Sequence, residues 1–127
     1  MAARNMGKAE QAEAEILDDI PDASLEPQQL DLASLASVRA AAERILSNHQ
    51  TIDLLINNAG VMALPEQRTD DGFEMQFGTN HLGHFAFTAL LMPTILASPD
   101  GRVVSVTSTG RHYRARLDPE NPHLEGS

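Results

Sequence analysis

Apolar positions along this chain recur at two spacings, one typical of helices and one of short strands. Apolar residues three and four apart predict a helix that Asn5 caps and Pro21 ends, and a second helix that Ser34 caps. Thr69 is expected to cap a longer third helix, with the two aspartates that follow it near the positive end of the helix dipole. The buried faces expected for the three helices are Ala9, Ala12, Ile16 and Ile20, then Leu35, Val38, Ala42 and Ile45, and finally Phe73, Phe77, Phe87 and Leu91.

Three extended segments are expected, at residues 28–32, 52–56 and 102–108. The last two are mostly apolar, which predicts strands buried on both faces. Strands alternating with helices indicate βαβ units, a parallel sheet and helices on both of its faces. The expected fold class is therefore α/β, a doubly wound, Rossmann-like parallel sheet that forms one partial domain over residues 1–127. Residues 109–127 are expected to form a loop or a disordered tail.

Charge and composition exclude several kinds of protein. Nine basic and 18 acidic residues give a formal net charge of −9, which disfavours nucleic acid as a partner. The absence of cysteine excludes disulfide scaffolds and thiolate metal sites. His81 and His84 have no third ligand at a suitable spacing, so we expect packing and helix-surface hydrogen bonds, and no metal. No apolar run is long enough to cross a bilayer and no secretory signal opens the chain, so we expect a cytoplasmic protein without a membrane partner.

Polar residues follow the expected strands at their carboxyl ends, where ligands bind to doubly wound sheets. Asp31, the segment Asn57–Gly60 and Ser108 all stand at such ends, as does Arg4 after the strand remnant Met1-Ala2-Ala3. Within Asn57–Gly60, the small residues allow a flat ligand to approach the backbone, and the amides can tie neighbouring strands together. A plain Asn/Gly turn is the alternative interpretation of that segment.

Two further polar residues are candidates for chemistry. Asn80 lies one and two turns after Phe77 and Phe73, which predicts a buried amide that needs hydrogen-bond partners. A purely structural amide is the alternative. Ser108 at the strand end is preferred to Ser105, which is expected to face the opposite side of the strand.

Taken together, these segments resemble one family in their order along the chain. They are Ala3-Arg4-Asn5, Asp31-Leu32, Asn57-Asn58-Ala59-Gly60, Asn80-His81-Leu82-Gly83-His84-Phe85 and Ser105-Val106-Thr107-Ser108. The set resembles the short-chain dehydrogenase/reductases, and within them the retinol-dehydrogenase-like subgroup. The resemblance covers essentially all 127 residues.

The resemblance implies an oxidoreductase that interconverts an alcohol and a carbonyl by hydride transfer with a nicotinamide cofactor. It implies that Ser108 orients the small-molecule substrate, and that Asn80 distorts its helix and holds a water of the proton relay. Arg4 would grip a 2′-phosphate, which favours NADP over NAD; a surface arginine is the alternative. The remaining cofactor-binding residues implied are Asp31 and Leu32 near the adenine, and Asn58, Ala59 and Gly60 along the adenosine.

The chain also departs from the family's pattern. It contains no Thr-Gly-(x)3-Gly-x-Gly loop, and its only tyrosine, Tyr113, is followed four residues later by Leu117 instead of lysine. The resemblance therefore implies an internal fragment that lacks the first strand and the strands after the fifth, and that is inactive by itself. In the strand order 3-2-1-4-5 the first strand is central, so two half-sheets with unpaired edges are expected.

Two classes of function stay open from the sequence. The first is a part of an oxidoreductase, and the second is a non-catalytic remnant or interaction module with a Rossmann-like architecture. The substrate is not specified by these residues. The oligomeric state, including a homo-oligomer, is also left open.

Overall fold

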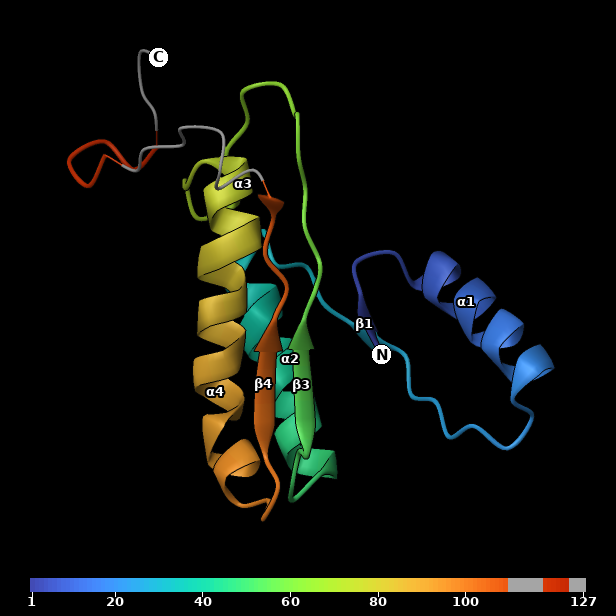
Figure 1. The fold of residues 1–127 in the computed structure, drawn as a ribbon. Coiled ribbons are helices and arrows are strands. Elements are labelled where there is room, and N and C mark those ends of the chain that lie inside the picture. The colour runs from blue at the N-terminus through green and yellow to red at the C-terminus, as the bar shows by residue number, and fades with distance from the viewer. Residues whose placement is uncertain (110–117, 124–127) are drawn as a thin grey trace.

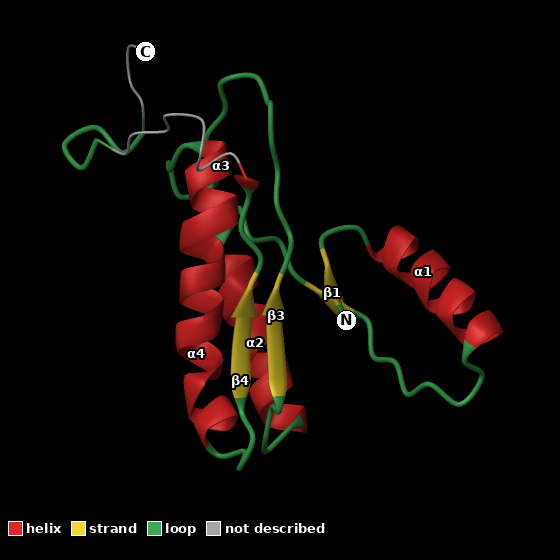
Figure 2. Ribbon diagram, viewed as in Figure 1, coloured by secondary structure: helices red, strands yellow, loops and turns green. Residues whose placement is uncertain are grey.

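The computed structural model describes residues 1–109 and 118–123 of the chain. Its helices and strands alternate as predicted (Figures 1 and 2). In chain order they are β1 (Ala2–Ala3), α1 (Met6–Asp19), β2 (Gln28–Gln29), α2 (Leu35–Asn48), β3 (Leu54–Asn57), α3 (Met75–Phe77), the π-helical turn η1 (Gly78–Gly83), α4 (His84–Leu96) and β4 (Arg102–Ser105). The predicted tail falls partly outside the described residues, and residues 118–123 contain no helix or strand. In the described part of the chain, no helix combines the length and apolarity that a membrane crossing requires.

The starts of the first two helices follow the predicted caps to different degrees. The Asn5 side chain accepts a hydrogen bond from the Lys8 amide at 3.1 Å, which confirms it as the cap of α1. Ser34 occupies the cap position of α2, but its side chain makes no capping bond. Instead, Asp71 Oδ2 accepts from the Leu35 amide at 2.8 Å. A carboxylate 36 residues away in sequence thus replaces the local cap.

The predicted cap of the third helix is wrong. The helix begins at Met75, and the Glu74 carboxylate caps it by accepting from the backbone amides of Gln76 and Phe77 at 2.9 and 2.7 Å. Thr69 accepts instead from the Phe73 amide at 3.1 Å. Residues 68–74 form a short antiparallel turn, with a bridge between Arg68 and Glu74, so the chain reverses before the helix can start.

The four strands form two separate parallel pairs. β1 pairs with β2, with Ala2 opposite Gln28. β3 pairs with β4, from Leu54 opposite Arg102 to Asn57 opposite Ser105. No described strand joins the two pairs, which confirms the expectation of two half-sheets. A hollow of about 710 Å³ lies where both pairs contribute lining residues.

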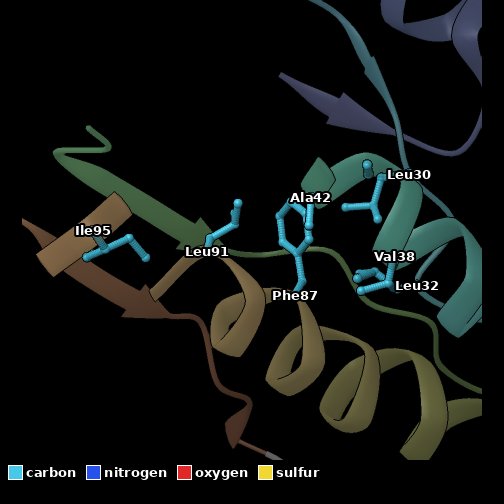
Figure 3. Packing of buried hydrophobic residues seen from close by; sticks show 8 residues of the cluster. Leu30, Leu32, Val38, Ala42, Phe87, Leu91 and Ile95 are labelled. Carbon is cyan, nitrogen blue, oxygen red and sulfur yellow. The ribbon is translucent and has the colours of Figure 1, made fainter. Parts of the chain in front are cut away.

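The core lies between α2, α4 and the residues that follow β2, Leu30 and Leu32 (Figure 3). Its buried members are Leu30, Leu32, Val38, Ala41, Ala42, Phe87, Leu91 and Ile95. Each large apolar side chain buried there stabilises the fold by about 1.5–3 kcal/mol relative to exposure. Because α2 and α4 pack on each other, the helical periodicity of both segments predicted their inner faces correctly.

The prediction that the strands are buried on both faces is wrong for β3 and β4. Leu54 and Ile56 keep 52% and 55% of their surface exposed, and Val104 keeps 45%. Helix α4 packs against β3, while α1 contacts β1 and lies apart from the β3–β4 pair (Figure 1). The second face of this pair is therefore uncovered in the described structure, although its sequence is apolar enough for burial.

Candidate active site

A crevice opens at the carboxyl ends of β3 and β4, beside η1 and the first turns of α4. Its volume is about 530 Å³, within the range of about 300–1,000 Å³ typical of small-molecule sites. Five predicted site residues line it, namely Asn58, Ala59, Gly60, Asn80 and Ser108. Residues separated by up to 50 positions in sequence are thus brought to one place, because parallel strands end at the same edge.

Asn80 clamps the loop that follows β3. Its Nδ2 donates to the Val61 carbonyl and its Oδ1 accepts from the Val61 amide, both at 2.8 Å. The predicted burial of Asn80 is wrong, since its side chain is exposed. The reason is the π-helical turn, which interrupts the α-helical period from which a buried face was predicted. The partners that the amide needs are nevertheless present.

The segment Asn57–Gly60 connects β3 to the helix and to the neighbouring strand. The buried Asn57 side chain donates from Nδ2 to Thr88 Oγ1 at 2.9 Å, so the amide ties β3 to α4. The Asn57 carbonyl accepts from the Val106 amide at 2.9 Å and extends the pairing with β4 by one residue. Ala59 and Gly60 are exposed, which leaves the backbone open to a flat ligand.

The serine region corrects one expectation. β4 ends at Ser105, so Val106, Thr107 and Ser108 follow the strand and do not continue its alternation. Ser105 and Ser108 both line the crevice, whereas Ser105 was expected to face the opposite side. Period-two reasoning fails here because it was extended past the last strand residue.

Three predicted cofactor residues lie outside this crevice. Arg4 is exposed directly after β1, and Asp31 follows β2. The Leu30 amide donates to the Ala3 carbonyl at 3.0 Å, so Arg4 and Asp31 follow adjacent positions of the β1–β2 pair. Leu32 is buried in the core. The predicted residues thus form two groups, one at the end of each half-sheet.

Asp31 makes the hydrogen bonds of a helix-entry residue. Its Oδ1 accepts from the Ala33 amide at 2.9 Å, and its own amide donates to Ser37 Oγ at 2.9 Å. Both bonds fix the turn that leads from β2 into α2. The same position at a strand end stays available to a ligand, because Asp31 is only partly buried.

The two histidines of η1 and α4 make the packing and surface contacts expected of them. His81 stacks on Phe77 with ring centroids 5.4 Å apart. His84 Nδ1 lies 3.0 Å from the Asn80 carbonyl oxygen. Within residues 1–109 and 118–123, no three His, Asp or Glu side chains are grouped so that they could hold a metal ion.

Some residues of the site were missed by sequence reasoning. Val61 contributes only backbone atoms, for which the sequence carries no signal. Thr88 and His84 both line the crevice and stand one helical turn apart. His84 follows Asn80 by four residues and Thr88 follows it by eight. This spacing is the signal that could have placed all three on one helix face.

The residues present fit a nucleotide cofactor in part. The exposed backbone at Ala59 and Gly60 and the exposed Arg4 cation suit a planar ring and a phosphate, respectively. The 127 residues contain no glycine-rich Thr-Gly-(x)3-Gly-x-Gly loop. Contacts to the pyrophosphate of a dinucleotide are therefore not assigned to any residue of this chain.

Comparison with known proteins defines the class of this chain. Residues 1–117 match the short chain dehydrogenase family, so the chain belongs to that family. Among curated proteins, it is 43% identical over 118 residues to retinol dehydrogenase 13 of Homo sapiens, covering 93% of this chain and 35% of that protein. It is 44% identical over 108 residues to retinol dehydrogenase 12 of Mus musculus, covering 85% of this chain and 34% of that protein. The chain thus spans about a third of the length of these relatives.

Solved structures agree on the architecture. An uncharacterized protein from Mycobacterium paratuberculosis superimposes with a TM-score of 0.80 at 40% identity, over 99% of this chain and 42% of that one. A protein described as a short chain dehydrogenase from Shigella flexneri, complexed with NADP, gives a TM-score of 0.73 at 26% identity, over 90% of this chain and 50% of that one. The predicted Rossmann-like class, present here as a partial parallel α/β fold, is confirmed.

Proposed function

We propose that this crevice is part of the active site of an oxidoreductase that transfers hydride between a nicotinamide cofactor and an alcohol or carbonyl substrate. The observation that carries the proposal is the meeting of Asn58, Gly60, Asn80 and Ser108 in one crevice, in a chain of the short chain dehydrogenase family. When bound, the cofactor supplies or accepts the hydride. The residues of this chain bind the cofactor and the substrate, orient them for the transfer and hold the protons that move with it.

Each residue has a distinct proposed role. The Ser108 hydroxyl donates a hydrogen bond to the substrate oxygen and orients the carbon for transfer. Asn80 holds the loop after β3 through Val61, which keeps the backbone of Ala59 and Gly60 in place beside the cofactor. We also propose that Asn80 holds a water of the relay that carries a proton to or from the substrate oxygen. Precise placement matters, because small displacements of reacting groups cost large factors in rate.

Arg4 makes the proposed cofactor NADP in preference to NAD. It is an exposed guanidinium at the end of β1, and no described residue pairs with it. A guanidinium binds a 2′-phosphate through paired hydrogen bonds, whereas NAD sites place an acid at the ribose hydroxyls. Asp31, on the adjacent strand position, is proposed to lie near the adenine, beside the backbone of Leu32.

Isothermal titration of the chain with NADP⁺ and NAD⁺ tests the cofactor. We expect NADP⁺ to bind more tightly, and Arg4→Ala to weaken NADP⁺ binding about tenfold while leaving NAD⁺ binding unchanged, as loss of a charge-assisted bond predicts. Arg39→Ala, an exposed arginine on α2, is the control. Equal affinity of Arg4→Ala and wild type for NADP⁺ would remove the assignment of Arg4. No binding of either nucleotide would contradict the proposed function itself.

The 127 residues by themselves are proposed not to turn over substrate. Neither a tyrosine followed four residues later by lysine nor a glycine-rich phosphate loop occurs in them. NADPH oxidation in the presence of a series of aldehydes and ketones should stay at the rate without protein. Turnover that Ser108→Ala abolishes and Ser47→Ala, an exposed serine on α2, preserves would show that these residues suffice for catalysis.

A second candidate function is an interaction module that pairs with another polypeptide. The hollow between the half-sheets and the exposed apolar residues of β3 and β4 favour it, since unpaired strands and uncovered apolar faces are ready binding surfaces. Nucleotide binding separates the two candidates. A chain that self-associates and binds neither nucleotide supports the interaction module.

A further inference from the structure

The imidazole of His84 has one ring nitrogen engaged and one that is not. Nδ1 lies 3.0 Å from the Asn80 carbonyl oxygen. A carbonyl oxygen can only accept, so Nδ1 carries the proton of the neutral ring. A neutral imidazole has a single N–H, which leaves Nε2 with its lone pair free to accept. No other described group is bonded to this ring.

The π-helical turn produces this arrangement. In a regular α-helix the amide of His84 would donate to the carbonyl of Asn80, four residues earlier. Here the His84 amide donates to the His81 carbonyl, and the Asn80 carbonyl accepts from the His84 ring. The side chain of Asn80 is held by Val61 at the same time. The His84 ring is thus hydrogen-bonded to the backbone of Asn80, whose side chain is itself hydrogen-bonded to Val61.

The position of His84 in the crevice makes its free ring nitrogen a candidate for contact with a ligand. His84 is partly buried and lines the crevice together with Ser105, Ser108 and the loop residue Asn58. Serine hydroxyls and asparagine amides can donate and accept, whereas Nε2 of this tautomer can only accept. His81 also lines the crevice, but it is exposed and its ring is stacked on Phe77.

We propose that His84 is a ligand-positioning residue whose Nε2 accepts a hydrogen bond from a hydroxyl group of the molecule bound in the crevice. The proposal rests on the proposed function for the kind of ligand, since a ribose and an alcohol substrate both carry hydroxyls. It assigns Nε2 of His84 as the atom that accepts the hydrogen bond of that hydroxyl. A molecule without a hydroxyl at this point loses the bond and leaves Nε2 unpaired.

The tautomer is tested first, without any ligand. The chain is labelled with ¹⁵N-histidine and long-range ¹H–¹⁵N correlations are recorded at about pH 8.5, above the ordinary titration range of imidazole. We expect His84, identified by the loss of its signals in His84→Phe, to be protonated on Nδ1 with an unprotonated Nε2. A ring protonated on Nε2 would overturn the proposal.

The ligand is tested next with two probes, NADP⁺ as the ribose source and cyclohexanol as the alcohol. We expect one of them to shift the Nε2 resonance of wild-type His84, and that probe identifies the hydroxyl. The same probe should bind about three- to tenfold more weakly to His84→Phe, whereas His84→Gln, whose amide oxygen can accept, retains binding. His49→Gln, outside this crevice, is the control and should bind as wild type does.

The outcomes separate this proposal from the function on which it rests. If NADP⁺ shifts the amide signals of Asn58 and Gly60 while Nε2 of His84 stays unchanged with both probes, the His84 proposal is wrong and the proposed function stands. If neither probe shifts any signal of the crevice, both are wrong. The wild-type spectra decide these cases even if His84→Phe does not fold.

Discussion

At the scale of single residues, the site is organised by asparagine side chains that hold backbone and helix together. Asn57 joins β3 to α4 through Thr88, and Asn80 joins η1 to the loop after β3 through Val61. The Asn57 side chain contributes its amide donor, whereas the Asn80 side chain uses both its donor and its acceptor. The loop that we propose to lie beside the cofactor is therefore held by side chains as well as by the sheet.

Replacement of Asn80 by Asp tests the clamp. The change removes the donor to the Val61 carbonyl and sets a carboxylate against it, so we expect a loss of about 1 kcal/mol in the free energy of unfolding. Hydrogen exchange at the Val61 amide should become faster. Both quantities are measured by urea denaturation and by NMR.

Asn58→Asp is the matched control, because Asn58 lines the same crevice and is exposed. It should leave the exchange of the Val61 amide unchanged. Equal effects of the two substitutions would mean that the pair of hydrogen bonds at Val61 does not hold the loop.

At the scale of elements, the π-helical turn fits against the turn that follows β2 through a glycine. A Cβ on Gly83 would collide with the carbonyl oxygen of Leu32 and come within 2.9 Å of its Cβ. The backbone of η1 can therefore approach Leu32, in the turn between β2 and α2, only without a side chain at this position. The close approach also sets where Asn80 and His84, on either side of Gly83, meet the crevice.

Gly83→Ala should destabilise the fold by about 1–3 kcal/mol, the usual cost of forcing extra volume into a packed contact. Gly7→Ala makes the same chemical change in α1, where the new Cβ meets only the Asn5 side chain at 3.5 Å. It should be neutral or stabilising by up to about 1 kcal/mol, because alanine favours helix. Thermal unfolding monitored by circular dichroism gives both values. A neutral Gly83→Ala would show that η1 and the turn after β2 can move apart freely.

At the scale of the whole molecule, the described chain leaves apolar surface uncovered. The β3–β4 pair has α4 on one face and exposed Leu54, Ile56 and Val104 side chains, and no third described strand pairs with it. Contiguous apolar surface and unpaired strand edges both promote association. We expect the 127 residues alone to self-associate, and to do so more strongly as their concentration rises.

Two lysine substitutions on adjacent residues test the origin of this association. Ile56→Lys changes a side chain that is 55% exposed, so it should reduce light scattering without lowering stability. Leu55→Lys changes a side chain packed against the core, so it should destabilise the fold instead. A wild-type chain that stays monomeric as its concentration rises would contradict the expectation of association.

The sequence by itself determined the order and type of the elements and the family. Helical spacing predicted the buried faces of α2 and α4, and short polar segments after the strands predicted Asn58, Gly60, Asn80 and Ser108 as crevice residues. These features are local, because spacing, caps and motifs lie within a few residues of one another.

Only the tertiary structure decided which faces are covered and which distant groups meet. The cap of α2 by Asp71, the clamp on Val61, the exposure of β3 and β4 and the ring contact of His84 each depend on a partner or an absence of cover that no local pattern encodes. A strand has the same apolar pattern whether or not another element packs on it, and a π-helical turn changes the face that a helical period assigns.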